Sequence, residues 1–215
     1  MSAIDAAFRG LRATSEKGLV VYLTAGDPTP SASLSYLRAA ADGGADVLEL
    51  GVPFSDPTAD GPTIEAASRR ALSRGMTVAG ALAIVRKFRR THGTPVVLFG
   101  YYNPFLRYGI PKLVRDARRA GVDGFLVVDL PLEEAGDAVP AMRAAGLDWI
   151  PLAAPTSGMT RIREFDRAGS GFLYLVSVTG VTGARNSLPA DLEAFVSRVR
   201  HVSTPPPPVR LGIST

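Results

Sequence analysis

Residues 48–62 read LELGVPFSDPTADGP, and this stretch decides how the rest of the chain is interpreted. A short apolar run leads into a loop rich in Pro and Asp, and a helical pattern follows. Side chains alternate along a strand, so Leu48 and Leu50 share one face and Glu49 lies on the other. If the two leucines pack under helices, Glu49 points into the mouth of a barrel, where partial burial disfavours the charged form of a carboxyl group.

The same order of strand, loop and helix repeats along the 215 residues. Short β-branched runs alternate with amphipathic patterns rich in Ala and Arg. We expect strands at 19–24, 45–50, 95–99, 123–128, 149–152, 171–176 and 209–212, and helices at 31–41, 62–74, 78–91, 110–120, 132–145, 159–168 and 188–202. The runs that are apolar almost throughout are typical of parallel strands covered on both faces.

Strand–helix alternation predicts right-handed βαβ units, in either an open doubly wound sheet or a (β/α) barrel. The barrel is favoured because no G-x-G-x-x-G follows the first strand, and because the unusual residues stand where several different strands end. Only seven strands are found, whereas a closed barrel has eight. We therefore expect an α/β fold in a single domain over residues 1–215, a TIM (β/α)8 barrel whose eighth βα unit is missing from this chain.

Composition argues against several kinds of chemistry. The chain has no Cys and only two His, so it has no disulfides or thiolate nucleophile and a multi-His metal centre is not expected. No apolar run approaches about 18 residues, so we expect no membrane span and a cytoplasmic protein. Lys and Arg outnumber Asp and Glu by 24 to 20, but their clusters have helical spacing and predict solvated helix faces, not a nucleic-acid site.

Glu49 and Asp60 are the candidate acid–base residues. Each has a simpler interpretation: Glu49 as a strand-end carboxylate that reaches water, and Asp60 as a turn or capping residue before a helix. Two carboxyl groups delivered to one rim, one on a strand and one on a loop, suit a reaction that moves two protons on one substrate.

A second candidate segment follows the sixth predicted strand. Residues 174–185 read YLVSVTGVTGAR, and small hydroxyl residues with glycines after a barrel strand can aim several backbone N–H groups at one anion. A further Gly-Ile-Ser occupies 212–214, after the seventh predicted strand. Together the two segments predict a phosphorylated small-molecule substrate.

These strings resemble the tryptophan synthase alpha chain family. The resembling segments are LTAGDP at 23–28, the run from Glu49 to Pro62, GYYNP at 100–104, GVDG at 121–124 with DLP at 129–131, APTS at 154–157, and Ser177 with GVTG at 180–183. They occur in the family's order over most of the chain, and the run that ends at Pro62 is long and specific.

The resemblance implies a (β/α)8 barrel that cleaves indole-3-glycerol phosphate to indole and glyceraldehyde 3-phosphate by a retro-aldol reaction. It implies that Glu49 protonates the indole ring carbon and then handles the proton of the glycerol hydroxyl. It also implies that Asp60 stabilises the positive charge on the indole nitrogen and accepts its proton.

Six substrate-binding residues are implied in the same way. The aromatic ones line the indole pocket, the threonine holds the loop of Asp60 closed, and the two glycines offer backbone N–H groups to the phosphate. They are Tyr22, Phe99, Tyr174, Thr182, Gly183 and Gly212.

Members of the family dock on a beta subunit that carries pyridoxal phosphate, in an αββα tetramer, and the alpha subunit itself holds no metal or cofactor. The sequence departs from the family at Leu211, where Phe is usual, and it lacks the eighth strand with its Gly-Ser phosphate contact. We therefore expect weak or absent lyase activity. Two alternatives stay open: a non-catalytic chain that only binds the beta subunit, and a free-standing lyase that releases indole without a partner.

Overall fold

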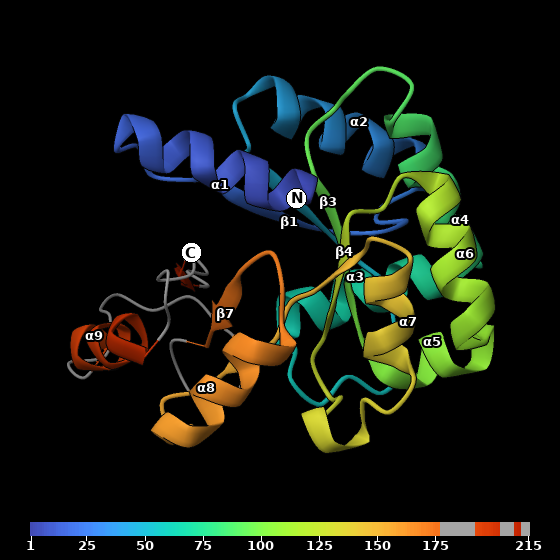
Figure 1. Cartoon of the computed structure of the whole chain (residues 1–215). Coiled ribbons are helices and arrows are strands. Elements are labelled where there is room, and N and C mark those ends of the chain that lie inside the picture. The colour runs from blue at the N-terminus through green and yellow to red at the C-terminus, as the bar shows by residue number, and fades with distance from the viewer. Residues whose placement is uncertain (177–191, 203–208, 212–215) are drawn as a thin grey trace.

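The computed structural model describes residues 1–176, 192–202 and 209–211 (Figure 1). The strands are β1 (Val20–Thr24), β2 (Val47–Gly51), β3 (Val96–Gly100), β4 (Gly124–Val127), β5 (Asp148–Trp149), β6 (Leu152–Ala153), β7 (Leu173–Leu175) and β8 (Val209–Leu211). The helices are α1 (Ala3–Thr14), α2 (Pro30–Asp42), α3 (Pro62–Ser73), α4 (Val78–Phe88), α5 (Tyr102–Tyr108), α6 (Ile110–Ala120), the 3-10 turn η1 (Leu132–Glu134), α7 (Ala138–Ala144), α8 (Met159–Ala168) and α9 (Leu192–Val202).

All the described strand pairs are parallel. Strands β1 to β5 form one sheet in sequence order, and β6, β7 and β8 form a second. The helices lie outside the strands, and α2, α4, α6 and α7 contact one another in turn around the five-stranded sheet (Figure 1). Sequential parallel pairing under a helical layer confirms the predicted α/β class, and it brings the carboxyl ends of the strands to one edge.

The strand expected at 149–152 is divided into two pieces, β5 and β6. The chain runs on through Ile150, whose N–H donates to the carbonyl of Phe125 at 2.8 Å, and Pro151, whose carbonyl accepts from Tyr174 at 2.9 Å. Because Pro151 has no N–H group, it cannot donate to a ladder. The chain is therefore bonded to β4 on one side and to β7 and the residues before it on the other, with no donor at Pro151.

The structure corrects the expectations for three helical segments and describes a fourth only in part. The helix expected at 132–145 is interrupted at Gly136, whose φ of +40° is not helical, so η1 and α7 are separate elements. Helices α1 and α5 were not expected at all. A capping signal was present for α1, since Ser2 and Asp5 form a reciprocal capping box. The helix expected at 188–202 is described only from Leu192 onward.

The apolar side chains of β2 belong to two different apolar clusters. Leu48 and Leu50 belong to the core between the sheet and the helices, as their alternation predicts. Val47 belongs to the interior core, which α1 closes from one end with the fully buried Ile4 and with Phe8. The inner face of the strands is therefore packed by apolar side chains at the α1 end.

Arg89 joins the end of α4 to the starts of β3 and β4. Its guanidinium donates to the carbonyls of Gly121 at 2.7 Å and Thr94 at 2.6 Å, and it pairs with the carboxylate of Asp123. Asp123 also accepts from the backbone N–H of Val96 at 2.7 Å. Burial raises the pKa of Asp123, and this backbone N–H and the guanidinium act in the opposite direction by stabilising its charged form.

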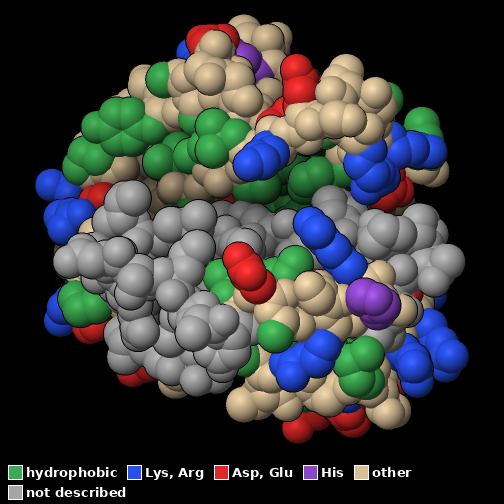
Figure 2. Space-filling view, turned by 90° about the vertical axis from the view of Figure 1, so that its left-hand side faces the viewer, with side chains coloured by type: hydrophobic (Ala, Val, Ile, Leu, Met, Phe, Trp, Pro, Cys, Tyr) green, Lys and Arg blue, Asp and Glu red, His purple; other side chains and the backbone are tan. Residues whose placement is uncertain are grey.

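Basic side chains stand in separate small groups on the face shown in Figure 2, among acidic and uncharged residues. Within the described part of the chain, no helix has the length and apolar character needed to cross a membrane.

Replacing Arg89 with Met should lower the free energy of unfolding by about 2–4 kcal/mol, because it leaves the half-buried Asp123 and two carbonyls without their donor. Urea unfolding followed by circular dichroism measures the loss. Arg90→Met is the matched control, since Arg90 is exposed and should change stability by less than about 0.5 kcal/mol. Equal stability of the two variants would contradict this account of Arg89.

Candidate active site

The candidate site lies where β1, β2 and β3 end. Glu49 stands on the inner face of β2 and is only 1% exposed. Tyr22 of β1 is its register partner, so the two side chains lie next to each other on the same face. The simpler interpretation of Glu49, a strand-end carboxylate that reaches water, is wrong because the side chain is buried.

Three aromatic rings form a continuous wall beside Glu49. The ring centroids of Tyr22 and Phe99 are 5.3 Å apart, and those of Phe99 and Tyr174 are 6.3 Å apart, both in edge-to-face geometry. Burial raises the pKa of the Tyr22 hydroxyl, and the nearby carboxylates Asp60 and Glu49 raise it further. The phenol therefore stays protonated, and the wall presents an apolar surface with a hydroxyl close to both acids.

Gly51 makes room for this wall. A Cβ atom added at Gly51 would lie 2.1 Å from the hydroxyl oxygen of Tyr22 and 2.6 Å from its Cζ. Any larger residue at the end of β2 would push the Tyr22 ring away from Glu49. The glycine is thus required by the close approach of the ring.

Asp60 comes from the loop between β2 and α3. Its carboxylate accepts a hydrogen bond from the hydroxyl of Tyr101, whose oxygen accepts in turn from the N–H of Ala59 at 3.0 Å. Burial raises the pKa of Asp60, and the Tyr101 hydrogen bond partly offsets the increase. Burial also raises the pKa of Tyr101, to about 12, so this hydroxyl remains a donor.

The capping interpretation of Asp60 is wrong. The N-cap of α3 is Gly61, and this helix has no side-chain cap. The Asp60 carboxylate instead reaches Tyr101, which belongs to the next strand end along the sheet.

Helix α3, which follows Asp60, is anchored to the loop after β1. Arg70 donates two hydrogen bonds of 2.8 Å to the carboxylate of Asp27, and Arg74 donates to the carbonyl of Pro28 at 2.7 Å. These contacts attach the loop after β1 to the helix that follows β2. They limit how far the segment that carries Asp60 can move.

The structure brings five of the eight expected site residues to this mouth: Tyr22, Glu49, Asp60, Phe99 and Tyr174. The expected phosphate-side residues Thr182, Gly183 and Gly212 lie outside the described residues. The described residues contain no cluster of three or more His, Cys, Asp or Glu side chains that could hold a metal ion.

Sequence reasoning missed the importance of Tyr101. It treated Tyr101 as one of several aromatic residues near strand ends. Its partners lie about 40 residues away in sequence, in the loop after β2. A second interaction at the same rim joins Asp129, after β4, to the N–H of Tyr102 at 2.6 Å.

Fold and site together define a (β/α)-barrel enzyme with two carboxyl groups beside an aromatic pocket. The family model for the tryptophan synthase alpha chain matches residues 8–215. The chain belongs to this family, whose members are lyases that cleave indole-3-glycerol phosphate in tryptophan biosynthesis.

Individual members of the family are similar to this chain along nearly its whole length. The alpha chain of Burkholderia multivorans is 51% identical, with 99% of this chain and 78% of that protein covered. The alpha chain of Geobacter sulfurreducens is 48% identical, with 100% and 81% covered. The tryptophan synthase structure from Mycobacterium tuberculosis has a TM-score of 0.91 at 37% identity, covering 100% of this chain and 81% of that one. These likenesses confirm the predicted TIM-barrel fold.

Replacing Gly51 with Ala should cost about 2 kcal/mol of stability, because the new methyl group displaces Tyr22. Urea unfolding measures the loss, and the double variant Gly51→Ala/Tyr22→Leu should recover part of it through coupling between the two sites.

Gly10→Ala is the control for the added methyl group, because Gly10 lies in α1 with nothing within 4 Å of the new Cβ. The free energy of unfolding of the Gly10→Ala chain should rise by up to about 1 kcal/mol. A Gly51→Ala chain as stable as the original would show that the contact with Tyr22 is easily relieved.

Proposed function

We propose that this chain cleaves indole-3-glycerol phosphate to indole and glyceraldehyde 3-phosphate, with Glu49 and Asp60 as its proton-transfer residues. The observation that carries the assignment of roles is the placement of a 1% exposed carboxyl group, Glu49, in the same aromatic-walled mouth as Asp60. Family membership supplies the reaction, and the geometry supports the residue roles.

Glu49 is suited to act at the ring carbon that bears the glycerol chain. Protonated Glu49 gives its proton to this carbon, which turns the indole ring into an electron sink. The resulting carboxylate then takes the proton of the glycerol hydroxyl, the carbon–carbon bond breaks, and its electron pair returns to the ring. A single buried carboxyl group can serve both steps. Giving its proton to the ring carbon leaves Glu49 as a carboxylate, which is the form that accepts a proton in the second step.

Asp60 is suited to act at the indole nitrogen. Protonation of the ring carbon places positive charge on this nitrogen, and a carboxylate within a partly buried site stabilises that charge strongly. The proton that Asp60 accepts from the nitrogen returns to it when the carbon–carbon bond breaks and the electron pair enters the ring. The Tyr101 hydrogen bond favours the charged form of Asp60, which is the form this role requires.

The aromatic wall of Tyr22, Phe99 and Tyr174 supports a role in holding the flat indole ring. We assign the phosphate contacts to Gly183 and Gly212, and the closing of the Asp60 loop to Thr182, all of which follow the family pattern. Proton transfers by two carboxyl groups account for the cleavage, so we propose that this chain uses no metal or cofactor of its own.

We also propose a tryptophan synthase beta chain as the partner, with the pyridoxal phosphate on that partner. The support comes from a solved relative, the tryptophan synthase α2β2 complex from Pyrococcus furiosus, which has a TM-score of 0.85 at 41% identity over 92% of this chain and 79% of that one. A chain without Cys that works in amino-acid biosynthesis fits a cytoplasmic location.

Replacing Glu49 with Gln should reduce indole formation about 1000-fold, because the amide keeps the shape but cannot transfer the proton. The assay measures indole released from indole-3-glycerol phosphate, with and without a beta chain, and a thermal melt checks folding. Glu134→Gln, an exposed carboxyl on η1, is the matched control and should keep its rate. A Glu49→Gln chain that kept its rate would remove Glu49 from the mechanism.

Replacing Tyr101 with Phe should shift the acid limb of the pH profile of kcat/KM to higher pH. Loss of the hydrogen bond raises the pKa of Asp60 further, so less of the carboxylate exists at a given pH. At the low-pH end, kcat/KM should fall about 10-fold, equivalent to about 1.4 kcal/mol. Tyr102→Phe is the control, and identical profiles for all three chains would refute the role of Tyr101.

A further inference from the structure

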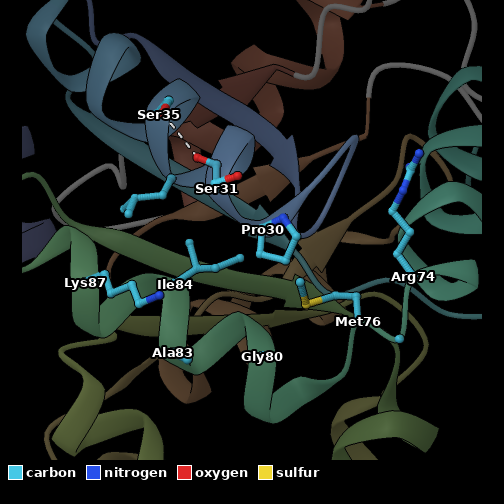
Figure 3. A pocket seen from close by; sticks show the side chains of 11 residues that line it. Pro30, Ser31, Ser35, Arg74, Met76, Gly80, Ala83, Ile84 and Lys87 are labelled. Atoms are coloured by element: carbon cyan, nitrogen blue, oxygen red, sulfur yellow. Dashed lines mark hydrogen bonds between the residues drawn. The ribbon is translucent and has the colours of Figure 1, made fainter.

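A groove lies between α2 and α4, outside the barrel (Figure 3). Its volume is about 610 Å³, within the range of small-molecule sites. Met76 and Ile84 form its floor and are only 6% and 3% exposed. Pro30 and Leu34 of α2 add to the apolar wall. A ligand with a compact apolar body could contact this floor and remove from water the apolar surface that Pro30 and Leu34 expose.

The floor is held in a defined position by close packing around Met76. A Cβ atom added at Gly26 would lie 2.6 Å from the Met76 methyl carbon, and one added at Gly80 would lie 2.8 Å from the sulfur. Two residues without side chains therefore leave the space that the thioether fills. The apolar surface of the groove is thus set by backbone on both sides of Met76.

The charge of the groove has one sign. Among the described residues, the lining includes Arg74 and Lys87 and no Asp or Glu. Arg74 already donates to the carbonyl of Pro28, and Figure 3 shows its side chain directed away from Met76. Lys87 makes no ion pair or hydrogen bond with any described residue, and Figure 3 shows its ammonium group directed toward Ile84. An unpaired cation beside an apolar floor is complementary to an anion that carries an apolar group.

We propose that this groove is a binding site for a small amphipathic carboxylate, whose apolar body lies on Met76 and Ile84 and whose carboxylate pairs with Lys87. A cationic ligand is disfavoured because the described lining residues include no carboxylate to pair with it. A fully polar anion such as free phosphate would leave the apolar floor uncovered. The site is separate from the barrel mouth, and the proposal does not depend on the lyase reaction.

The test is a titration of the full chain with 4-phenylbutyrate, followed by NMR of the methionine methyl groups. The methyl signal of Met76 should shift and saturate, while that of Met142, which is buried elsewhere, should stay unchanged. 4-Phenylbutan-1-ol has the same apolar body without the charge. It should bind more weakly than the carboxylate.

Three variants separate the parts of the proposal. Lys87→Gln should weaken binding of the carboxylate about fivefold and leave binding of the alcohol unchanged. Lys17→Gln removes the same charge at an exposed position outside the groove and should have no effect on either ligand. Ala83→Phe, on the exposed rim, should fill the groove and abolish binding of both ligands.

Two outcomes would overturn the proposal. One is the absence of a saturating Met76 shift up to about 10 mM ligand, the upper end of weak small-molecule affinities. The other is equal affinity of the original, Lys87→Gln and Ala83→Phe chains for 4-phenylbutyrate, which would place the binding elsewhere on the surface.

Discussion

The inner face of β2 has three side-chain positions, and the rest of the structure depends on how they are filled. Val47 packs into the interior core that α1 closes, Glu49 is buried one step further along, and Gly51 leaves space for the Tyr22 ring. Parallel pairing places Tyr22 opposite Glu49 and Phe99 opposite Gly51. The register of three strands therefore sets both the shape of the pocket and the surroundings of its buried acid.

Polar contacts hold the two ends of the barrel in different ways. At the α1 end, Arg89 satisfies several carbonyls and the carboxylate of Asp123 at once, which offsets the cost of burying charge. At the mouth, Tyr101 donates one hydrogen bond to Asp60 and accepts one from the N–H of Ala59, which connects the Asp60 loop to the next strand end. The end that is held by Arg89 suits a scaffold.

The loop after β1 connects the mouth to the outer helical layer. Asp27 of this loop pairs with Arg70 of α3, the helix that follows Asp60, and Gly26 packs on Met76 in the floor of the outer groove. One short segment thus contacts both the catalytic side of the fold and the groove between α2 and α4.

The sequence by itself determined the alternation of parallel strands and helices, the outward direction of Leu48 and Leu50, and the family that the chain resembles. These properties are local, because side-chain direction in a strand has a period of two residues. Only the tertiary structure decided that α1 closes the interior, that the segment around Pro151 joins β4 to β7, and that Tyr101 rather than a helix cap holds Asp60. Each depends on residues far apart in sequence, whose contact is set by strand register and packing.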